Sequence, residues 1–122
     1  MPVYPALASQ DYCYITTTGR VTGKPHEIEI WFALVGDTIY ILAGGGHDSG
    51  WVKNVKKQPG VPVRIGKKVR VGIEANFTGT ARFVTAKRED ALARRLLLEK
   101  YAAFDDLDEW GRTALPVAFE LA

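Results

Sequence analysis

The sequence predicts a mainly β fold with α elements: an antiparallel barrel of six or seven strands, one short helix after the third strand, and one longer helix near the C-terminus. Most apolar segments are short, rich in β-branched or aromatic residues, and bounded by glycine or proline, as strands are. They follow one another through tight turns and do not alternate with helices, which argues against a Rossmann sheet. One segment, 87–103, has the length and apolar spacing of a long helix.

The first two predicted strands are separated by a polar turn. Residues 12–18 are aromatic or β-branched, which predicts a strand, and residues 19–25 hold two glycines and a proline, which predicts a turn. Residues 26–35 alternate between two kinds of side chain, which predicts one half-buried strand. Its two faces carry Ile28, Ile30 and Phe32 on one side and Glu27, Glu29 and Trp31 on the other.

A tight turn at 36–37 leads into a predicted strand over 38–43, so that a hairpin forms. The glycine-rich loop 44–50 follows, and Asp48 or Ser49 can cap the short helix that comes next. The other predicted elements are this helix, which ends near Lys57, strands over 61–65, 69–75 and 76–84, the long helix over 87–103, a helical turn over 105–110 and a strand over 115–121.

The long helix is predicted to be amphipathic. Its apolar stripe consists of Leu92, Leu96, Leu97 and Tyr101, and its outer face carries Lys87, Arg88, Arg94 and Lys100.

Length and composition indicate a single globular domain over residues 1–122. The formal net charge of +2 is too small to indicate nucleic-acid binding by itself. The sequence has no apolar run long enough for a membrane span and no visible signal peptide, so we expect no integral membrane segment and a cytoplasmic location. The one cysteine, Cys13, excludes an internal disulfide and is expected to be a buried, inert thiol.

The first glycine-rich turn carries two cations, Arg20 and Lys24. It differs from a phosphate-binding P-loop, which has four residues between its glycines and a hydroxyl residue after the lysine, whereas here there are three and Pro25 follows. Two interpretations are equally open: a hairpin turn with solvated cations, or a turn whose cations hold a phosphate or carboxylate.

The second turn, Gly44-Gly45-Gly46-His47-Asp48-Ser49-Gly50, places three consecutive glycines between a strand and a helix. Such a run costs chain entropy and is typical of a backbone that approaches a ligand closely. The start of the helix favours an anion, so we expect an anion-binding cradle here, with a flexible loop as the alternative. Of the two histidines, His47 is the better functional candidate, and neither has metal-ligand spacing, so no metal site is expected.

Two further charge patterns have simple interpretations. Glu27 and Glu29 share one strand face, and a solvated or dimer-facing edge explains them better than a glycosidase pair does. A cationic stretch in the middle of the chain is either a solvated face or a groove for a ligand with an acidic tail, and nucleic acid is disfavoured. Its members are Lys53, Lys56, Lys57, Arg64, Lys67, Lys68 and Arg70.

The order of these motifs resembles the deazaflavin-dependent nitroreductase family, among the flavin and deazaflavin oxidoreductases related to pyridoxamine phosphate oxidases. The resemblance covers about residues 12–121. It rests on Thr-Thr-Thr-Gly-Arg-x-x-Gly-x-Pro at 16–25, Trp-Val-Lys-Asn-Val-Lys-Lys-Gln-Pro at 51–59, Val-x-Val-Arg-Ile-Gly at 61–66 and Asp-Glu-Trp-Gly-Arg-Thr-x-Leu-Pro at 108–116.

The resemblance implies a split β-barrel that binds coenzyme F420, a 5-deazaflavin with a phosphodiester and a glutamate tail. It implies hydride transfer to an electron-poor small molecule such as a quinone, nitro compound or enone, with orientation and electrostatics supplied by the protein. By the same resemblance Arg20 and Lys24 face the phosphate or acidic tail. Ile28, Glu29, Ile30 and Trp31 line the ring edge, and Gly44, Gly45, Gly46, His47, Asp48, Ser49, Trp51 and Asn54 enclose the cofactor.

The chain departs from the family pattern in two places. Gly45 stands where nitro-reducing members carry a lysine, which leaves FMN open as an alternative cofactor. Those members line the substrate pocket with tyrosines at the positions of Tyr101, Phe104 and Leu107, and only Tyr101 keeps the hydroxyl. Tyr101 is therefore either a proton donor or substrate-orienting residue, or a core tyrosine.

Three functions are compatible with the sequence. The first is an F420-dependent oxidoreductase, the second an FMN-dependent oxidoreductase of the same fold, and the third a cofactor-binding protein without turnover. The small barrel leaves an apolar face to cover and split barrels usually pair, so a homodimer is expected.

Overall fold

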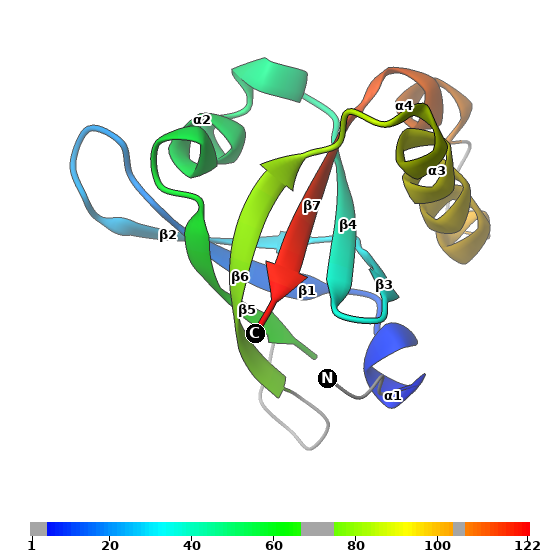
Figure 1. Cartoon of the computed structure of the whole chain (residues 1–122), viewed down its shortest axis with the longest axis horizontal. Coiled ribbons are helices and arrows are strands. Elements are labelled where there is room, and N and C mark those ends of the chain that lie inside the picture. Colours follow the sequence, from blue (N-terminus) through cyan, green and yellow to red (C-terminus); the bar gives the residue numbers. More distant parts are fainter. Residues whose placement is uncertain (1–4, 67–74, 104–106) are drawn as a thin grey trace.

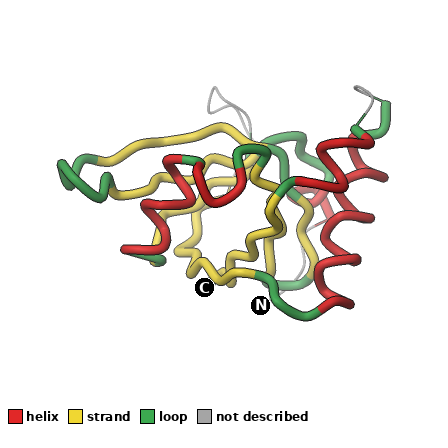
Figure 2. Tube along the Cα trace, turned by 90° about the horizontal axis from the view of Figure 1, so that it is seen from above, coloured by secondary structure: helices red, strands yellow, loops and turns green. Residues whose placement is uncertain are grey.

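The computed structural model describes residues 5–66, 75–103 and 107–122. These residues form one seven-stranded sheet in the order β2-β1-β5-β6-β7-β4-β3, in which every neighbouring pair is antiparallel. The sheet curls into a split barrel, which confirms the predicted fold class (Figures 1 and 2). The strands are β1 (Cys13–Thr18), β2 (Pro25–Ile30), β3 (Ala33–Val35), β4 (Thr38–Ala43), β5 (Gly60–Ile65), β6 (Ala75–Phe83) and β7 (Leu115–Leu121).

The helices are α1 (Pro5–Ala8), the 3₁₀ turn η1 (Gly46–Asp48), α2 (Gly50–Lys57), α3 (Lys87–Tyr101) and α4 (Asp108–Thr113). Helix α2 lies at one side of the barrel, α3 and α4 lie at the other, and α1 lies near the N-terminus at the bottom of the view (Figure 1). The short helix α2 packs beside β1, whereas α3 packs against β3, β4 and β7, away from the β1–β2 hairpin. None of the helices in the described part of the chain has the length and hydropathy needed to cross a bilayer.

The boundaries of several elements differ from the predictions. Helix α1 was not predicted, and α3 ends at Tyr101 rather than at residue 103. Helix α4 begins at Asp108, later than the predicted turn over 105–110, part of which lies outside the described residues. The predicted strand over 69–75 also lies outside them, except for Ala75, where β6 begins.

The predicted strand over 26–35 is in fact two strands. β2 pairs with β1, with Ile30 opposite Cys13, and β3 pairs with β4, with Ala33 opposite Tyr40. The chain crosses from one edge of the sheet to the other between them, so β2 and β3 become its two edge strands. Alternation of side chains could not reveal this break, because it reports which face a residue occupies and not which strand is its partner.

The apolar side chains form two buried clusters. The first fills the barrel and includes Ile15, Ile41 and Phe119, none of which is exposed. The second lies between the sheet and α3 and includes Leu97 and Tyr101, as the predicted stripe required. Cys13 is fully buried in the first cluster, as predicted, and burial raises the pKa of its thiol.

Candidate ligand-binding site

Two cavities lie one after the other along β2. The polar cavity, of about 380 Å³, is lined by Thr17, Gly19, Arg20, Val21, Thr22, His26, Ile28, Gly50, Trp51 and Asn54. The aromatic cavity, of about 410 Å³, is lined by Tyr12, Glu29, Ile30, Trp31, Leu42, Gly44, Leu107 and Trp110. Ile28 and Ile30 are two residues apart on one strand, a rise of about 7 Å, so the cavities adjoin. Both volumes lie in the range of small-molecule sites.

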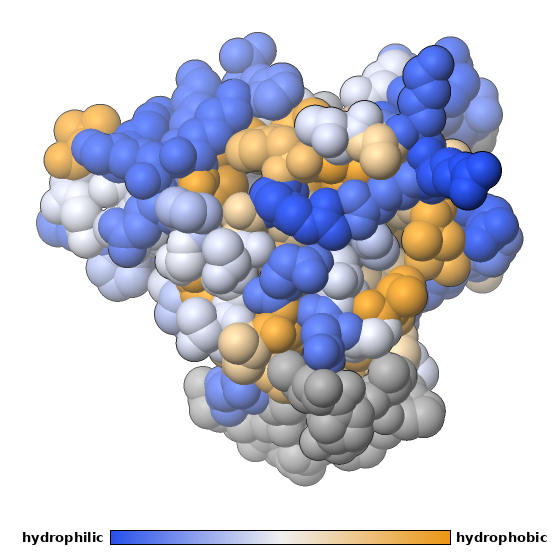
Figure 3. Space-filling view, viewed as in Figure 1, coloured by the Kyte–Doolittle hydropathy of each residue, from blue (hydrophilic) through white to orange (hydrophobic). Residues whose placement is uncertain are grey.

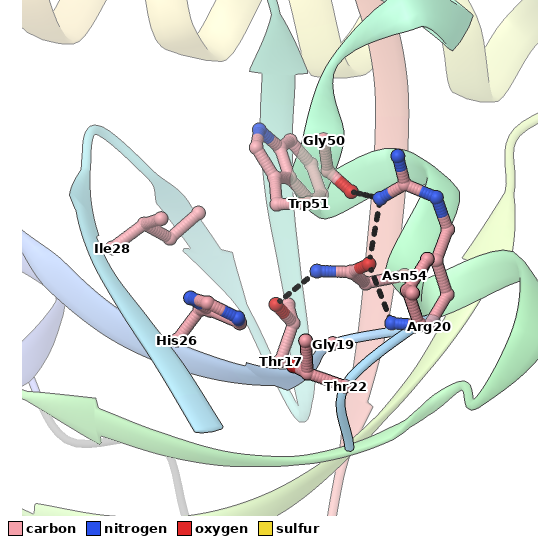
Figure 4. A pocket seen from close by; sticks show the side chains of 10 residues that line it. Thr17, Gly19, Arg20, Thr22, His26, Ile28, Gly50, Trp51 and Asn54 are labelled. Atoms are coloured by element: carbon pink, nitrogen blue, oxygen red, sulfur yellow. Dashed lines mark hydrogen bonds between the residues drawn. The ribbon is translucent and has the colours of Figure 1, made fainter. Parts of the chain in front are cut away.

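In the polar cavity, Arg20 is tied to α2 (Figure 4). Its Nη1 donates to Oδ1 of Asn54 at 2.9 Å and to the carbonyl oxygen of Gly50 at 3.4 Å, and its backbone N–H donates to the same Oδ1 at 3.2 Å. Asn54 is almost fully buried, and its Nδ2 donates to Oγ1 of Thr17 on β1 at 3.0 Å. The amide therefore links strand, turn and helix, and it fixes the guanidinium at the cavity.

The turn before β2 has its own hydrogen bonds. The N–H of Gly19 donates to the carbonyl of Lys24, and the N–H of Gly23 donates to the carbonyl of Gly19, each at 2.8 Å. A Cβ at Gly19 would come within 2.9 Å of Oγ1 of Thr22 and 3.0 Å of Nε2 of His26, so these two side chains would have to shift to admit it. The turn directs Arg20 into the polar cavity, whereas Lys24 is exposed and lines neither cavity.

The polar cavity lies in a positively charged part of the molecule. Residues 17–26 and 49–60 contain five cations and no carboxylate. These cations are Arg20, Lys24, Lys53, Lys56 and Lys57. Figure 3 shows the hydrophilic side chains gathered over α2. Lys57 also supports the turn, because its Nζ donates to the carbonyl of Arg20 at 2.9 Å. An anionic ligand would be attracted to this face.

The cationic stretch predicted from the sequence does not form one continuous surface. Arg64 is buried on β5, with its guanidinium carbon 4.0 Å from the centre of the Tyr14 ring, and it does not join the lysines of α2. Successive side chains of a β-strand point to opposite faces of the sheet. Arg64 therefore does not share a surface with the lysines of α2, although it is close to them in sequence. Lys67, Lys68 and Arg70 lie outside the described residues.

The second glycine loop reaches the cavities only at its two ends. Gly44 lines the aromatic cavity and Gly50 the polar one. The residues between them line neither cavity; they are Gly45, Gly46, His47, Asp48 and Ser49. They turn back on themselves, since the N–H of Asp48 donates to the carbonyl of Gly45 and the N–H of Ser49 to that of Gly46, each at 3.2 Å.

Gly45 and His47 are both explained by packing within the loop region. A Cβ at Gly45 would lie 2.5 Å from Oγ of Ser49, so the glycine permits the close fold of the loop. The His47 ring packs 5.7 Å from the ring of Phe83. Ser49 occupies the predicted N-cap position of α2, although its side chain makes no capping hydrogen bond.

One wall of the aromatic cavity is made of packed aromatic rings. The Trp31 indole stacks on the Tyr101 ring, with centroids 4.3 Å apart and planes 6° from parallel, and meets Trp110 edge-on at 5.8 Å. Glu29 lies at the rim, where its carboxylate accepts a hydrogen bond from the Tyr14 hydroxyl at 2.7 Å. This combination of flat apolar surface and a polar rim suits a planar ligand.

Tyr101 lies behind this wall and does not line the cavity. It is fully buried, and its hydroxyl is 2.7 Å from the carbonyl oxygen of Asp11 and 3.1 Å from that of Phe32. Burial raises the pKa of the hydroxyl. This placement corresponds to the core alternative for Tyr101 rather than to the proton donor.

The two cavities thus contain a large part of the predicted site. Arg20, Ile28, Trp51 and Asn54 meet in the polar cavity, and Glu29, Ile30, Trp31 and Gly44 meet in the aromatic one. Sequence reasoning did not assign several lining residues, among them Tyr12, Thr17, His26 and Trp110. Two of these four lie in motifs that carry the resemblance, Thr17 in the motif at 16–25 and Trp110 in the one at 108–116.

Sequence comparison with known proteins identifies a family. The model of the family described as F420H(2)-dependent quinone reductase matches residues 3–122. A curated F420H(2)-dependent quinone reductase of Mycobacterium tuberculosis is 37% identical over 62 residues, which span 48% of this chain and 41% of that protein.

Solved structures share the fold. A structure described as an F420 reductase superposes with a TM-score of 0.74 at 16% identity, covering 100% of this chain and 96% of the other. One described as an F420-H2 dependent reductase superposes with a TM-score of 0.64 at 23% identity, covering 92% and 94%.

Proposed function

The chain belongs to the F420H(2)-dependent quinone reductase family, and from this premise we propose that it is an oxidoreductase that uses reduced coenzyme F420 to reduce an electron-poor acceptor, in the first place a quinone. The observation that carries the proposal is the pair of adjoining cavities on β2, one cationic and one aromatic. An amphipathic cofactor and a planar acceptor need such neighbouring environments.

The residues of the polar cavity fit the anionic part of the cofactor. Arg20 supplies a fixed guanidinium, the surrounding segments carry no carboxylate, and Gly19 leaves room where a Cβ would collide with its neighbours. The start of α2 at Gly50 adds backbone N–H groups and the positive end of the helix dipole. Together these features support binding of the phosphodiester here.

The apolar residues at the junction of the cavities fit a ring system. Ile28 and Trp51 line the inner side of the polar cavity, and Ile30 continues the same face of β2 into the aromatic cavity. Bound F420H2 would supply the hydride. Trp31 and Trp110 would hold the planar acceptor beside it and exclude water from the reacting atoms.

Three finer features are part of the same proposal. Nitro compounds and enones share the electron-poor character of quinones and are proposed as further acceptors. A homodimer would cover an edge of the split sheet, where β2 has β1 on only one side. A cytoplasmic location is proposed as the place where a reduced cofactor is supplied. Light scattering on the purified chain tests the dimer.

The experiment that tests the function titrates the purified chain separately with F420 and with FMN, followed by fluorescence, and then adds menadione to the reduced complex. We expect selective F420 binding and protein-dependent oxidation of F420H2. Binding of FMN but not F420 would favour the FMN-dependent alternative. Tight F420 binding without oxidation by any acceptor class would favour a binding protein without turnover.

A further inference from the structure

We propose that Lys100 and Tyr101, at the end of α3, are positioning residues that set the orientation of Trp31 in the aromatic cavity and so control the KM for the acceptor. Neither residue lines the cavity. The part of this inference that concerns the acceptor rests on the proposed function.

The chain leaves the sheet between β2 and β3. Ile30 is the last residue of β2 and Ala33 the first of β3, so Trp31 and Phe32 fall between two ladders that belong to different edges of the sheet. Backbone groups at such a break lack strand partners and need others when they are buried. Phe32 is fully buried.

The end of α3 provides these partners. The N–H of Phe32 donates to the Tyr101 hydroxyl oxygen at 3.0 Å, and the carbonyl of Phe32 accepts from Nζ of Lys100 at 2.9 Å. The Tyr101 hydroxyl has one proton, which it can donate to the carbonyl of Asp11 or to that of Phe32. The peptide groups on both sides of Phe32 are therefore held by two consecutive residues of one helix.

Lys100 and Tyr101 also pack against aromatic rings. Tyr101 stacks on the Trp31 indole with nearly parallel planes, and the Lys100 ammonium lies 3.7 Å from the centre of the Phe32 ring. The end of α3 thus holds both the backbone between β2 and β3 and the side chain of Trp31. Because Trp31 forms a wall of the aromatic cavity, a shift of this helix end would tilt that wall.

Lys100 would not have been chosen from the sequence, which predicts it on the outer face of the helix. In the structure its side chain folds back over Phe32 and is half-buried, and this burial lowers the pKa of its ammonium to about 8. A cation is costly at such a place unless it forms a specific contact, and the contact here is the Phe32 carbonyl.

The test compares Lys100→Met and Tyr101→Phe with Tyr40→Phe, a matched control. Tyr40 is also a buried tyrosine, but its hydroxyl donates to Glu89 at 2.7 Å. Protein labelled with 5-fluorotryptophan carries one ¹⁹F probe on each of its three tryptophans, and single Trp→Phe variants assign them. This readout needs no turnover. Lys100→Arg, which retains a cationic donor, is the rescue variant.

We expect the Trp31 resonance to shift or broaden in Lys100→Met and Tyr101→Phe, while that of Trp51 stays in place. Tyr40→Phe should change neither, and Lys100→Arg should restore most of the Trp31 signal. In the kinetic arm, the KM for menadione should rise roughly 3- to 10-fold in both variants, with kcat and F420 affinity nearly unchanged.

An unchanged Trp31 resonance in both variants would overturn the proposal. So would a loss of kcat in Tyr101→Phe while Lys100→Met behaves as wild type, because that pattern identifies Tyr101 as a proton donor. A displaced Trp31 resonance in a protein that binds no F420 would support the positioning role and overturn the proposed function.

Discussion

The polar cavity and the aromatic cavity share strand β2, yet different interactions form them. In the polar cavity, hydrogen bonds of Arg20 and Asn54 join a hairpin turn to α2, and the arginine side chain is exposed. In the aromatic cavity, Trp31 rests on the fully buried Tyr101. Exposed polar contacts contribute little to folding and buried rings contribute much. The exposed Arg20 can therefore be altered for binding alone, whereas the aromatic region couples binding to stability.

The largest effect is expected at Tyr101. Tyr101→Ala should lower the free energy of unfolding by about 3–5 kcal/mol, because it removes a fully buried ring and leaves a cavity. Urea denaturation measures the loss. The matched control is Tyr12→Ala, since Tyr12 lines the aromatic cavity that Tyr101 supports from behind but is 36% exposed, and it should cost less than about 1 kcal/mol. Equal losses would contradict the assignment of Tyr101 to the supporting core.

Arg20 should show the opposite behaviour. Arg20→Ala should weaken F420 binding by about 1–3 kcal/mol, or roughly 5- to 150-fold in Kd, with little change in unfolding. Lys24→Ala is the control, because Lys24 belongs to the same turn but lines neither cavity. Fluorescence titration of both variants distinguishes them. If Lys24→Ala weakened binding as much as Arg20→Ala, the ligand would extend along the outside of the turn.

Substitution of Asn54 should affect both stability and cofactor binding. Asn54→Ala should lower the free energy of unfolding by about 1–2 kcal/mol and also weaken F420 binding, since the buried amide holds both Thr17 and Arg20. Gln58→Ala is the matched control, as its amide donates to Oγ1 of Thr18 at an exposed position. Wild-type affinity in Asn54→Ala would show that Arg20 does not need this anchor.

The smallest effect is expected at Glu89, which lines neither cavity. Its carboxylate accepts two hydrogen bonds from Arg82, each at 2.6 Å, and this pairing lowers the pKa of Glu89 from 4.5 to about 2. A lowered folded-state pKa means that the stabilisation is complete above pH 4.5 and is lost as the pH falls towards 2. Glu89→Gln should flatten this part of the stability profile, with F420 affinity and acceptor KM unchanged. If the steep loss of stability at low pH persists in Glu89→Gln, that loss comes from another carboxylate.

The sequence predicted most strands and the starts of α2 and α3 because turn residues and side-chain periodicity are local signals. It also predicted that Arg20 and Asn54 share a site, although they are 34 residues apart, through the order of the motifs. It could not predict the break at Trp31 and Phe32, because the inward set of Ile28, Ile30 and Phe32 continues without interruption across it.

The missed parts of the site depend on tertiary contacts. Tyr12 and Trp110 join Trp31, which the sequence did assign to the site, only when the sheet curls and α4 packs beside it. The residues from Gly45 to Ser49 were predicted to enclose the cofactor, but they line neither cavity and hydrogen-bond within their own loop. Lys100 was placed outside because helical periodicity gives the direction of the Cα–Cβ bond and not the path of a long side chain.

Under the proposed function, the polar cavity binds the cofactor and the aromatic cavity binds the acceptor. This assignment is tested most directly by single-turnover oxidation of F420H2 by menadione, followed by the return of deazaflavin absorbance. Three proteins are compared: wild type, Arg20→Ala and Lys100→Met. We predict protein-dependent oxidation in wild type. Arg20→Ala should need more cofactor to reach the same rate, and Lys100→Met more menadione. Oxidation that is no faster with wild-type protein than without it would contradict the proposed function, and variants that both need more of the same reactant would contradict the separation of the two cavities.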